Sequence, residues 1–260
     1  MQDALDFPPS LQRDGFVATI TLRRPAKLNR LSTEDLHVLQ SHCREIAQDG
    51  NTRVVVLTAD TTGQKRPVFC AGYDVGGFAD PKHDPRLFEK TVDGLAQLPQ
   101  VVMALANGSV YGGATDLLLA CDVRLGLEAA EFRMPACALG LHYYPSGMRR
   151  SVEVLGLNGA KQAFLTASPL SFERLREWGV FLSLHAPQGL EARGRALAQE
   201  MALLAPMALQ ASKSSLNEIG QGLDDPDVLM RREAQCLASS DFFEGRQAFA
   251  DKRQPRFTGQ

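Results

Sequence analysis

The sequence predicts an α/β protein in which a largely parallel sheet is followed by a helical C-terminal region. Short apolar or β-branched runs alternate with helical patterns through the first half of the chain, which is the order of βαβ units. From residue 146 onward the apolar residues recur at helical spacing. The chain has 260 residues, of which 44% are hydrophobic and 22% charged, so it is long enough to bury a sizeable core.

In the first half, we expect strands at residues 16–22, 54–58, 68–71, 101–106 and 122–127. The strand at 68–71 is the weakest of these, because Pro67 confines it to the start or the edge of a sheet. Residues 33–48 have the apolar spacing of an amphipathic helix with Ser32 or Thr33 as its cap. A further helix is expected to begin at Gly113.

In the second half, helices are expected at residues 148–155, 159–166, 171–178, 190–204 and 206–218, with two more between 225 and 252. The division predicts a core over residues 1–190 and a helical region over 191–260. Residues 76–85, rich in glycine, proline and charge, predict a mobile loop.

Composition excludes several classes of function. The net charge is −2 with both signs dispersed, so we expect neither nucleic acid nor a membrane surface as a partner. The N-terminus has no basic start or apolar run, and nothing approaches a transmembrane length. Five cysteines at irregular spacing indicate reduced, mostly buried thiols in a cytoplasmic protein. Since no histidines or cysteines have ligand spacing, no metal site is expected.

Two glycine-containing segments contain the most specific information about chemistry. They are FCAGYD at residues 69–74 and NGSVYGGATD at residues 107–116, and each follows a β-like run. Small residues at such turns let the backbone approach a ligand closely and direct its N–H groups outward. Two such turns side by side supply two donors to one developing oxyanion, and losing one such donor typically costs about a hundred- to a thousandfold in rate.

These segments resemble the oxyanion-hole motifs of the crotonase (enoyl-CoA hydratase/isomerase) superfamily. The resemblance extends from ITLRRPAKLNRLS at residue 20 to DKRQPRF at residue 251. It implies a spiral of ββα units with helical C-terminal contacts in a homotrimer or a dimer of trimers. It also implies an acyl-CoA thioester as substrate and no permanently bound cofactor, coenzyme A being the carrier of the substrate. The implied donors are the N–H groups of Tyr73 and Gly113, the latter at a helix start.

The resemblance also assigns residues to coenzyme A. Lys27 and Leu28 lie in the loop PAKLN that contacts the nucleotide in the family, and Ala71 lies where the family contacts adenine or pantetheine. Lys252 and Phe257 lie in the C-terminal element that closes over coenzyme A. A cation in that element suits a phosphate group.

This chain departs from the hydratase pattern at both acid/base positions. Asp116 stands where a hydratase has its first glutamate, and Ala136 in PACALGL stands at the second. An alanine cannot transfer a proton, and Asp116 is shorter by one methylene, on the order of 1.5 Å, at a position where a base must lie within about 3 Å of its proton. Water addition by two carboxylates is therefore not expected. Asp116 also suits a structural reading, as a charge at a helix start.

The segment His142-Tyr143-Tyr144 follows, and its pattern is closest to methylmalonyl-CoA decarboxylase-like members of the family. Decarboxylation forms the enolate directly and needs no base. We expect Tyr143 to orient the leaving carboxylate and His142 either to do the same or to supply a proton, while Tyr144 fits a pocket wall. A malonyl-type decarboxylase is the main hypothesis; a hydratase or isomerase using Asp116, and a non-catalytic acyl-CoA-binding protein, remain open.

Overall fold

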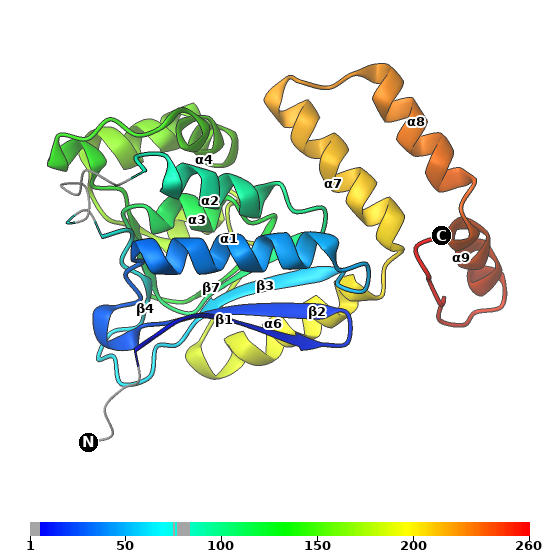
Figure 1. Ribbon diagram of the computed structural model, residues 1–260, viewed down its shortest axis with the longest axis horizontal. Coiled ribbons are helices and arrows are strands. Elements are labelled where there is room, and N and C mark those ends of the chain that lie inside the picture. The colour runs from blue at the N-terminus through cyan, green and yellow to red at the C-terminus, as the bar shows by residue number, and fades with distance from the viewer. Residues whose placement is uncertain (1–5, 75, 77–83) are drawn as a thin grey trace.

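The computed structural model describes residues 6–74, 76 and 84–260, and its main feature is a six-stranded sheet (Figure 1). Its strand order is β1-β2-β3-β5-β7-β10, in which β1 is antiparallel to β2 and the remaining pairs are parallel. The strands are β1 (Phe7–Asp14), β2 (Val17–Arg23), β3 (Val54–Ala59), β5 (Val101–Ala106), β7 (Val123–Leu127) and β10 (Ser183–His185). Every residue of β5 is buried, as expected for a strand covered on both faces.

A second sheet positions the glycine turns. It has the order β4-β6-β8-β9, with parallel pairs β4–β6 and β6–β8 and an antiparallel pair β8–β9. The strands are β4 (Val68–Cys70), β6 (Ser109–Tyr111), β8 (Glu131–Arg133) and β9 (Leu170–Ser171). The strand after Pro67 lies at the edge of this sheet, so the sequence-based expectation for it is confirmed.

Helices cover both faces of the six-stranded sheet: α1 and α2 lie on one side and α6 on the other (Figure 1). The helices of the core are α1 (Thr33–Gln48), α2 (Leu87–Ala96), α3 (Ala114–Leu119), α4 (Pro145–Thr166), α5 (Phe172–Glu177) and α6 (Pro187–Ala202). Short 3₁₀ turns occupy Pro25–Lys27 and Ala136–Leu139. Helix α1 has the predicted bounds and begins with a capping box between Ser32 and Asp35.

Some elements were not predicted from the sequence. The edge strand β1 contains two prolines, and its register shifts between Phe7 and Ser10, so its pattern does not resemble a regular strand. Helix α2 follows the expected loop directly and was not foreseen; residues 77–83 of that loop lie outside the described residues. Helix α4 joins the two helices expected at 148–166, with a kink at Gly156, whose φ is 68°.

The C-terminal helices extend away from the sheet, as the orange and red segments of Figure 1 show. They are α7 (Pro206–Gln221), α8 (Pro226–Leu237) and α9 (Ser240–Ala250). Lys213 attaches α7 to the core through the Gln100 carbonyl at 2.9 Å and Asp122 at 2.7 Å. Arg53 donates to the carbonyl oxygens of Ala202, at 3.0 Å, and Phe257, at 2.8 Å. The expected boundary at residue 190 falls within α6, which packs on the sheet.

The described part of the chain is also informative about membranes and thiols. No helix there is long and apolar enough to cross a membrane. Cys43, Cys70 and Cys121 are buried, and burial raises the pKa of the Cys70 thiol to about 12. Cys137 is exposed, so the expectation of buried thiols is wrong there, because the 3₁₀ turn at Ala136–Leu139 turns this side chain outward.

Candidate active site

The two glycine turns lie side by side because the strands before them are paired. Strand β4 is parallel to β6, so the segments that follow Cys70 and Tyr111 leave the same edge of the sheet. Gly72 has a φ of 96°, which favours glycine, and a Cβ at this position would lie 3.1 Å from the nitrogen of Gly113. The same Cβ would lie 2.8 Å from the carbonyl oxygen of Tyr111. The predicted proximity of the two turns is therefore confirmed.

Gly113 is the N-cap of α3, where the backbone N–H groups of the first turn point out of the helix. Among the described residues, no acceptor receives a hydrogen bond from the Gly113 N–H. A Cβ on Gly113 would lie 2.7 Å from Cζ of Phe88, so the ring of Phe88 packs directly on this turn. The ring of Tyr73 lies 5.7 Å from that of Phe88, centroid to centroid. An aromatic wall thus stands beside the two turns.

The loop that contains Lys27 and Leu28 is bonded to the first glycine turn. The N–H of Ala71 donates to the carbonyl of Leu28 at 2.9 Å, and the N–H of Leu31 donates to the carbonyl of Gly72 at 2.8 Å. Leu28 is 43% exposed and its φ is 54°, so its side chain is available to a ligand. Leu28 and Ala71 therefore lie side by side, and Lys27 precedes Leu28 in the same loop.

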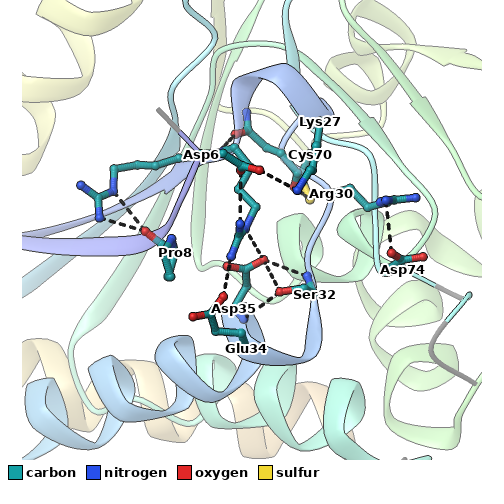
Figure 2. A network of polar contacts seen from close by, with 12 residues as sticks. Asp6, Pro8, Lys27, Arg30, Ser32, Glu34, Asp35, Cys70 and Asp74 are labelled. Atoms are coloured by element: carbon teal, nitrogen blue, oxygen red, sulfur yellow. Dashed lines mark hydrogen bonds and ion pairs between the residues drawn. The ribbon is translucent and has the colours of Figure 1, made fainter. Parts of the chain in front are cut away.

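A polar network holds this loop in place (Figure 2). Lys27 Nζ lies 2.6 Å from Asp6, and Arg30 pairs with Asp74 at 3.2 Å. The side-chain oxygen of Ser32 and its N–H both bond to Asp35, at 2.8 Å each. Because Lys27 is half exposed and its partner is a surface carboxylate, the ammonium group remains within reach of an anionic ligand.

Asn29, which the sequence reading did not single out, fixes the path of the loop. It is 1% exposed, with a φ of 53°, a conformation that asparagine adopts more readily than most residues. Its amide donates to the carbonyl oxygens of Asp60, at 2.8 Å, and Val68, at 3.2 Å. The Cys70 thiol donates to the Asn29 carbonyl at 3.0 Å. Cys70 thus packs beneath the site, as expected.

Asp116 lies at the centre of a buried polar network. It is fully buried in the first turn of α3, and its N–H bonds to the Gly113 carbonyl at 3.1 Å. Arg150, from α4, donates to its Oδ1 at 2.6 Å, and the Tyr144 hydroxyl donates a short hydrogen bond to its Oδ2. Arg150 also contacts Asp93 of α2 at 2.6 Å. Both carboxylate oxygens of Asp116 are therefore bonded.

Burial and pairing act in opposite directions on Asp116. Burial raises the pKa of this carboxyl above its ordinary value, while Arg150 and the Tyr144 hydroxyl act to lower it. The two carboxylates beside Arg150 raise the pKa of its guanidinium despite the burial. Arg150 thus stays charged, and its contact at 2.6 Å favours the ionised form of Asp116.

The two tyrosines of the predicted segment stack with ring centroids 4.2 Å apart. Tyr143 is 7% exposed, and its hydroxyl donates to that of Tyr144 at 3.1 Å. Burial raises the pKa of both phenols well above the ordinary value. Tyr144, treated from the sequence as a wall, is the tyrosine that contacts Asp116, and its ring lies 6.2 Å from that of Phe88. Tyr143 contacts Tyr144 and reaches Asp116 only through it.

The remaining predicted positions are separated from this network. His142 is exposed. Ala136 is 3% exposed and provides no polar group. Phe257 is bonded to Arg53 at the start of β3, whereas Leu28 follows the end of β2, and the two strands run in parallel. That separation is roughly 16 Å along the strands. One chain therefore does not bring the C-terminal element to the loop that contains Lys27.

Sequence reasoning missed Arg150, Asp93, Phe88 and Glu89. Arg150 lies inside the predicted helix at 148–155, and only the tertiary structure shows that its side chain is largely buried, at 12% exposed. Glu89, 8% exposed, bonds to Arg86 at 2.8 Å and to Ser146 at 3.2 Å. No sequence feature marked Phe88 or Glu89, since helix α2, which contains both, was not itself predicted. No described group of three or more histidine, cysteine or acidic residues is arranged to hold a metal ion.

A hollow lies on the face of the six-stranded sheet that α6 covers. It has a volume of about 1290 Å³ and lies between β2, β3 and helix α6, with Thr19, Thr58 and Asn107 among its lining residues. None of the residues expected to bind or react lines it. The hollow is therefore separate from the turns that contain Tyr73 and Gly113 and from the buried Asp116.

Comparison with known proteins agrees with this arrangement. The enoyl-CoA hydratase/isomerase family model matches residues 12–260. The putative enoyl-CoA hydratase/isomerase YngF of Bacillus subtilis (strain 168) is 33% identical over 253 residues, covering 94% of this chain and 95% of the relative. The methylmalonyl-CoA decarboxylase of Escherichia coli (strain K12) is 26% identical over 251 residues, with coverage of 94% and 95%. The crystal structure of an enoyl-CoA hydratase from Bacillus anthracis superposes with a TM-score of 0.86 at 29% identity, covering 98% of this chain and 100% of that chain.

Proposed function

This chain belongs to the enoyl-CoA hydratase/isomerase family, and we propose that within it the protein decarboxylates a malonyl-type CoA ester. The observation that supports this reaction most directly is the state of Asp116. Both of its oxygens are bonded, to Arg150 and to Tyr144, and Ala136 occupies the second acid/base position. The reaction passes through an enolate, yet neither acid/base position offers an unbonded carboxylate that could act as a base. Loss of carbon dioxide forms the enolate without a base.

The oxyanion is stabilised by backbone donors. We assign the N–H groups of Tyr73 and Gly113 to the thioester oxygen, because the two turns lie side by side and Gly113 begins a helix. As the bond between the α-carbon and the carboxylate breaks, its electron pair forms the enolate and the negative charge moves to that oxygen. Donors aimed at developing charge in a site with little water contribute several kcal/mol, on the order of 3 for one donor.

The leaving carboxylate is placed against the aromatic wall. Phe88 is 8% exposed and lies between Tyr73 and Tyr144, so a carboxylate there loses much of its hydration. The Tyr144 hydroxyl donates its hydrogen bond to Asp116. This hydroxyl therefore offers little stabilisation to the carboxylate of the substrate. Tyr143 acts on the substrate through Tyr144. Stabilising the enolate more than the ground-state carboxylate is what accelerates the step.

Proton delivery completes the reaction. The enolate carbon takes a proton after carbon dioxide leaves, and the exposed His142 is the predicted group for supplying it from the solvent side. The raised pKa values of Tyr143 and Tyr144 make these phenols poor proton donors by comparison.

The binding of coenzyme A is proposed to involve two subunits. Leu28 and Ala71 lie together beside the first turn, with Lys27 in the same loop, whereas Phe257 lies at the other end of the parallel strands and Lys252 follows the end of α9. We propose that these two C-terminal residues reach the coenzyme A of a neighbouring copy in a homotrimer or dimer of trimers that works in the cytoplasm. The extended helices α7 to α9 support such an arrangement, since they expose large apolar side chains, among them Leu216, Ile219, Met230 and Phe249.

A second reaction has one observation in its favour. Asp116 is a carboxylate three residues after the oxyanion donor, so a hydratase or isomerase that uses it alone needs the release of its contacts with Tyr144 and Arg150. A non-catalytic acyl-CoA-binding protein is the third outcome. The close approach of the two glycine turns in this chain speaks against it.

The test is a mass-spectrometric turnover assay with methylmalonyl-CoA and crotonyl-CoA in parallel. We expect loss of the mass of carbon dioxide from methylmalonyl-CoA, with crotonyl-CoA unchanged. Gain of the mass of one water on crotonyl-CoA alone contradicts the proposal and assigns hydration to Asp116. Binding of both esters, measured by calorimetry, without turnover assigns the protein to the binding role.

A further inference from the structure

Three helices meet at the guanidinium group of Arg150. It comes from α4 and lies between Asp116 of α3 and Asp93 of α2, at 2.6 Å from each carboxylate. The Arg150 side chain is 12% exposed and that of Asp116 is fully buried, whereas that of Asp93 is 28% exposed. The contact with Asp116 is therefore the one shielded from water, and the contact with Asp93 holds the guanidinium from its outer side.

The position of Asp116 would suit a base if it were released. It lies in the same helical turn as Gly113, and residues three apart on a helix are neighbours on one face. The Tyr144 ring that it contacts lies beside Phe88, which packs on the Gly113 turn. A Cβ on Gly147 would come within 2.9 Å of Oδ2 of Asp116, so glycine at position 147 lets α4 lie close to the Asp116 carboxylate.

We propose that Arg150 is a positioning residue that determines which reaction the site performs. By holding Asp116 in an ion pair, it withholds this carboxylate from the α-proton of a bound acyl-CoA and so favours decarboxylation over isomerisation or hydration. The inference rests on the proposed enolate chemistry of the same site. Arg150 lies outside both glycine motifs and both acid/base positions, yet in this proposal it determines the type of reaction.

The suppressed step is proton abstraction from the α-carbon of a thioester. The C–H bond breaks, its proton moves to a carboxylate oxygen of Asp116, and its electron pair forms the enolate held by the backbone donors. The guanidinium stabilises the charge of the Asp116 carboxylate, so the paired carboxylate is a weaker base than burial alone would make it. Without Arg150, the burial that raises the pKa of Asp116 acts unopposed by that charge, and the carboxylate becomes a stronger base.

The experiment measures deuterium incorporation at the α-carbon of propionyl-CoA in deuterated water, by mass spectrometry. Propionyl-CoA has no carboxylate to lose, so this readout does not depend on decarboxylation. We expect negligible exchange with the wild-type protein and an increase of about a hundredfold with Arg150→Gln, the lower end of what a positioned base contributes. Arg150→Lys keeps the charge and should resemble the wild type. Arg150→Gln combined with Asp116→Asn should lose the exchange again.

Several results would overturn the proposal. A folded Arg150→Gln protein that binds propionyl-CoA but exchanges no faster than the wild type contradicts it. So does exchange by the double variant, since Asp116 would then not be the base. If Arg150→Gln fails to fold, the wild type still provides a test: exchange that Asp116→Asn abolishes shows that the paired carboxylate already acts as a base. If the variants show the expected pattern of exchange but the wild type does not decarboxylate methylmalonyl-CoA, only the proposed function is overturned.

Discussion

Replacing Gly113 by proline is expected to remove one oxyanion donor while leaving the turn intact. The φ of Gly113 is −56°, close to the value that a proline ring imposes, so the backbone accepts the change. A Cβ at this position comes within 2.7 Å of Phe88, which costs about 1–3 kcal/mol of overpacking. Gly113→Ala has the same Cβ and keeps the N–H, and it is therefore the matched control.

The difference between the two variants isolates the hydrogen bond. We expect kcat of Gly113→Pro to be about a hundred- to a thousandfold below that of Gly113→Ala, which corresponds to roughly 2.7–4 kcal/mol of lost transition-state stabilisation. The assay is the rate of propionyl-CoA formation from methylmalonyl-CoA, with thermal unfolding followed by circular dichroism. Repeating the pair in a Phe88→Leu background relieves the clash with the ring. Rates within about threefold of each other in both backgrounds would refute the assignment of this N–H to the oxyanion.

Four further predictions concern the neighbours of the site and the attachment of the C-terminal region. Gly147→Ala should lower the free energy of unfolding by about 1–3 kcal/mol in urea titrations, since its Cβ would meet Tyr143 at 2.5 Å and Tyr144 at 2.7 Å; an unchanged midpoint contradicts this packing. Tyr144→Phe should lower kcat for decarboxylation more than Tyr143→Phe does, because the hydroxyl of Tyr143 acts only through that of Tyr144, and the reverse order would return the role to Tyr143. Arg53→Met should destabilise the protein by about 3 kcal/mol and speed proteolysis after α6, because two charge-assisted hydrogen bonds to carbonyl groups are lost; equal protease resistance would exclude the anchoring role. Glu244 has its pKa lowered from 4.5 to about 2, chiefly by its hydrogen bond with Arg253, so the pair stabilises the fold above pH 4.5 and this contribution is lost as the pH falls toward 2; Glu244→Gln should be less stable than the wild type at neutral pH, and the gap should close with acid.

Much of the local structure follows from short-range pattern. The helix at Thr33–Gln48 could be predicted to the residue, because a capping serine precedes a regular apolar spacing that includes Leu36, Leu39 and Ile46. The apolar runs at β3 and β5 are equally clear. Strand β1 and helix α2 were missed, the first because its prolines are tolerated only at a sheet edge and the second because its short pattern follows an irregular loop.

The sequence by itself determined the family, the two glycine-containing turns and the absence of a carboxylate at Ala136, since each depends on residue types at fixed spacing along the chain. Only the tertiary structure shows that the Asp116 carboxylate is buried and bonded at both oxygens. Its partners Arg150, Tyr144 and, through Arg150, Asp93 come from three different helices, and no spacing along the chain predicts that they meet. Only the packing of α2, α3 and α4 brings these charges together in a site with little water, and there the strength of an ion pair decides whether a carboxylate can act as a base.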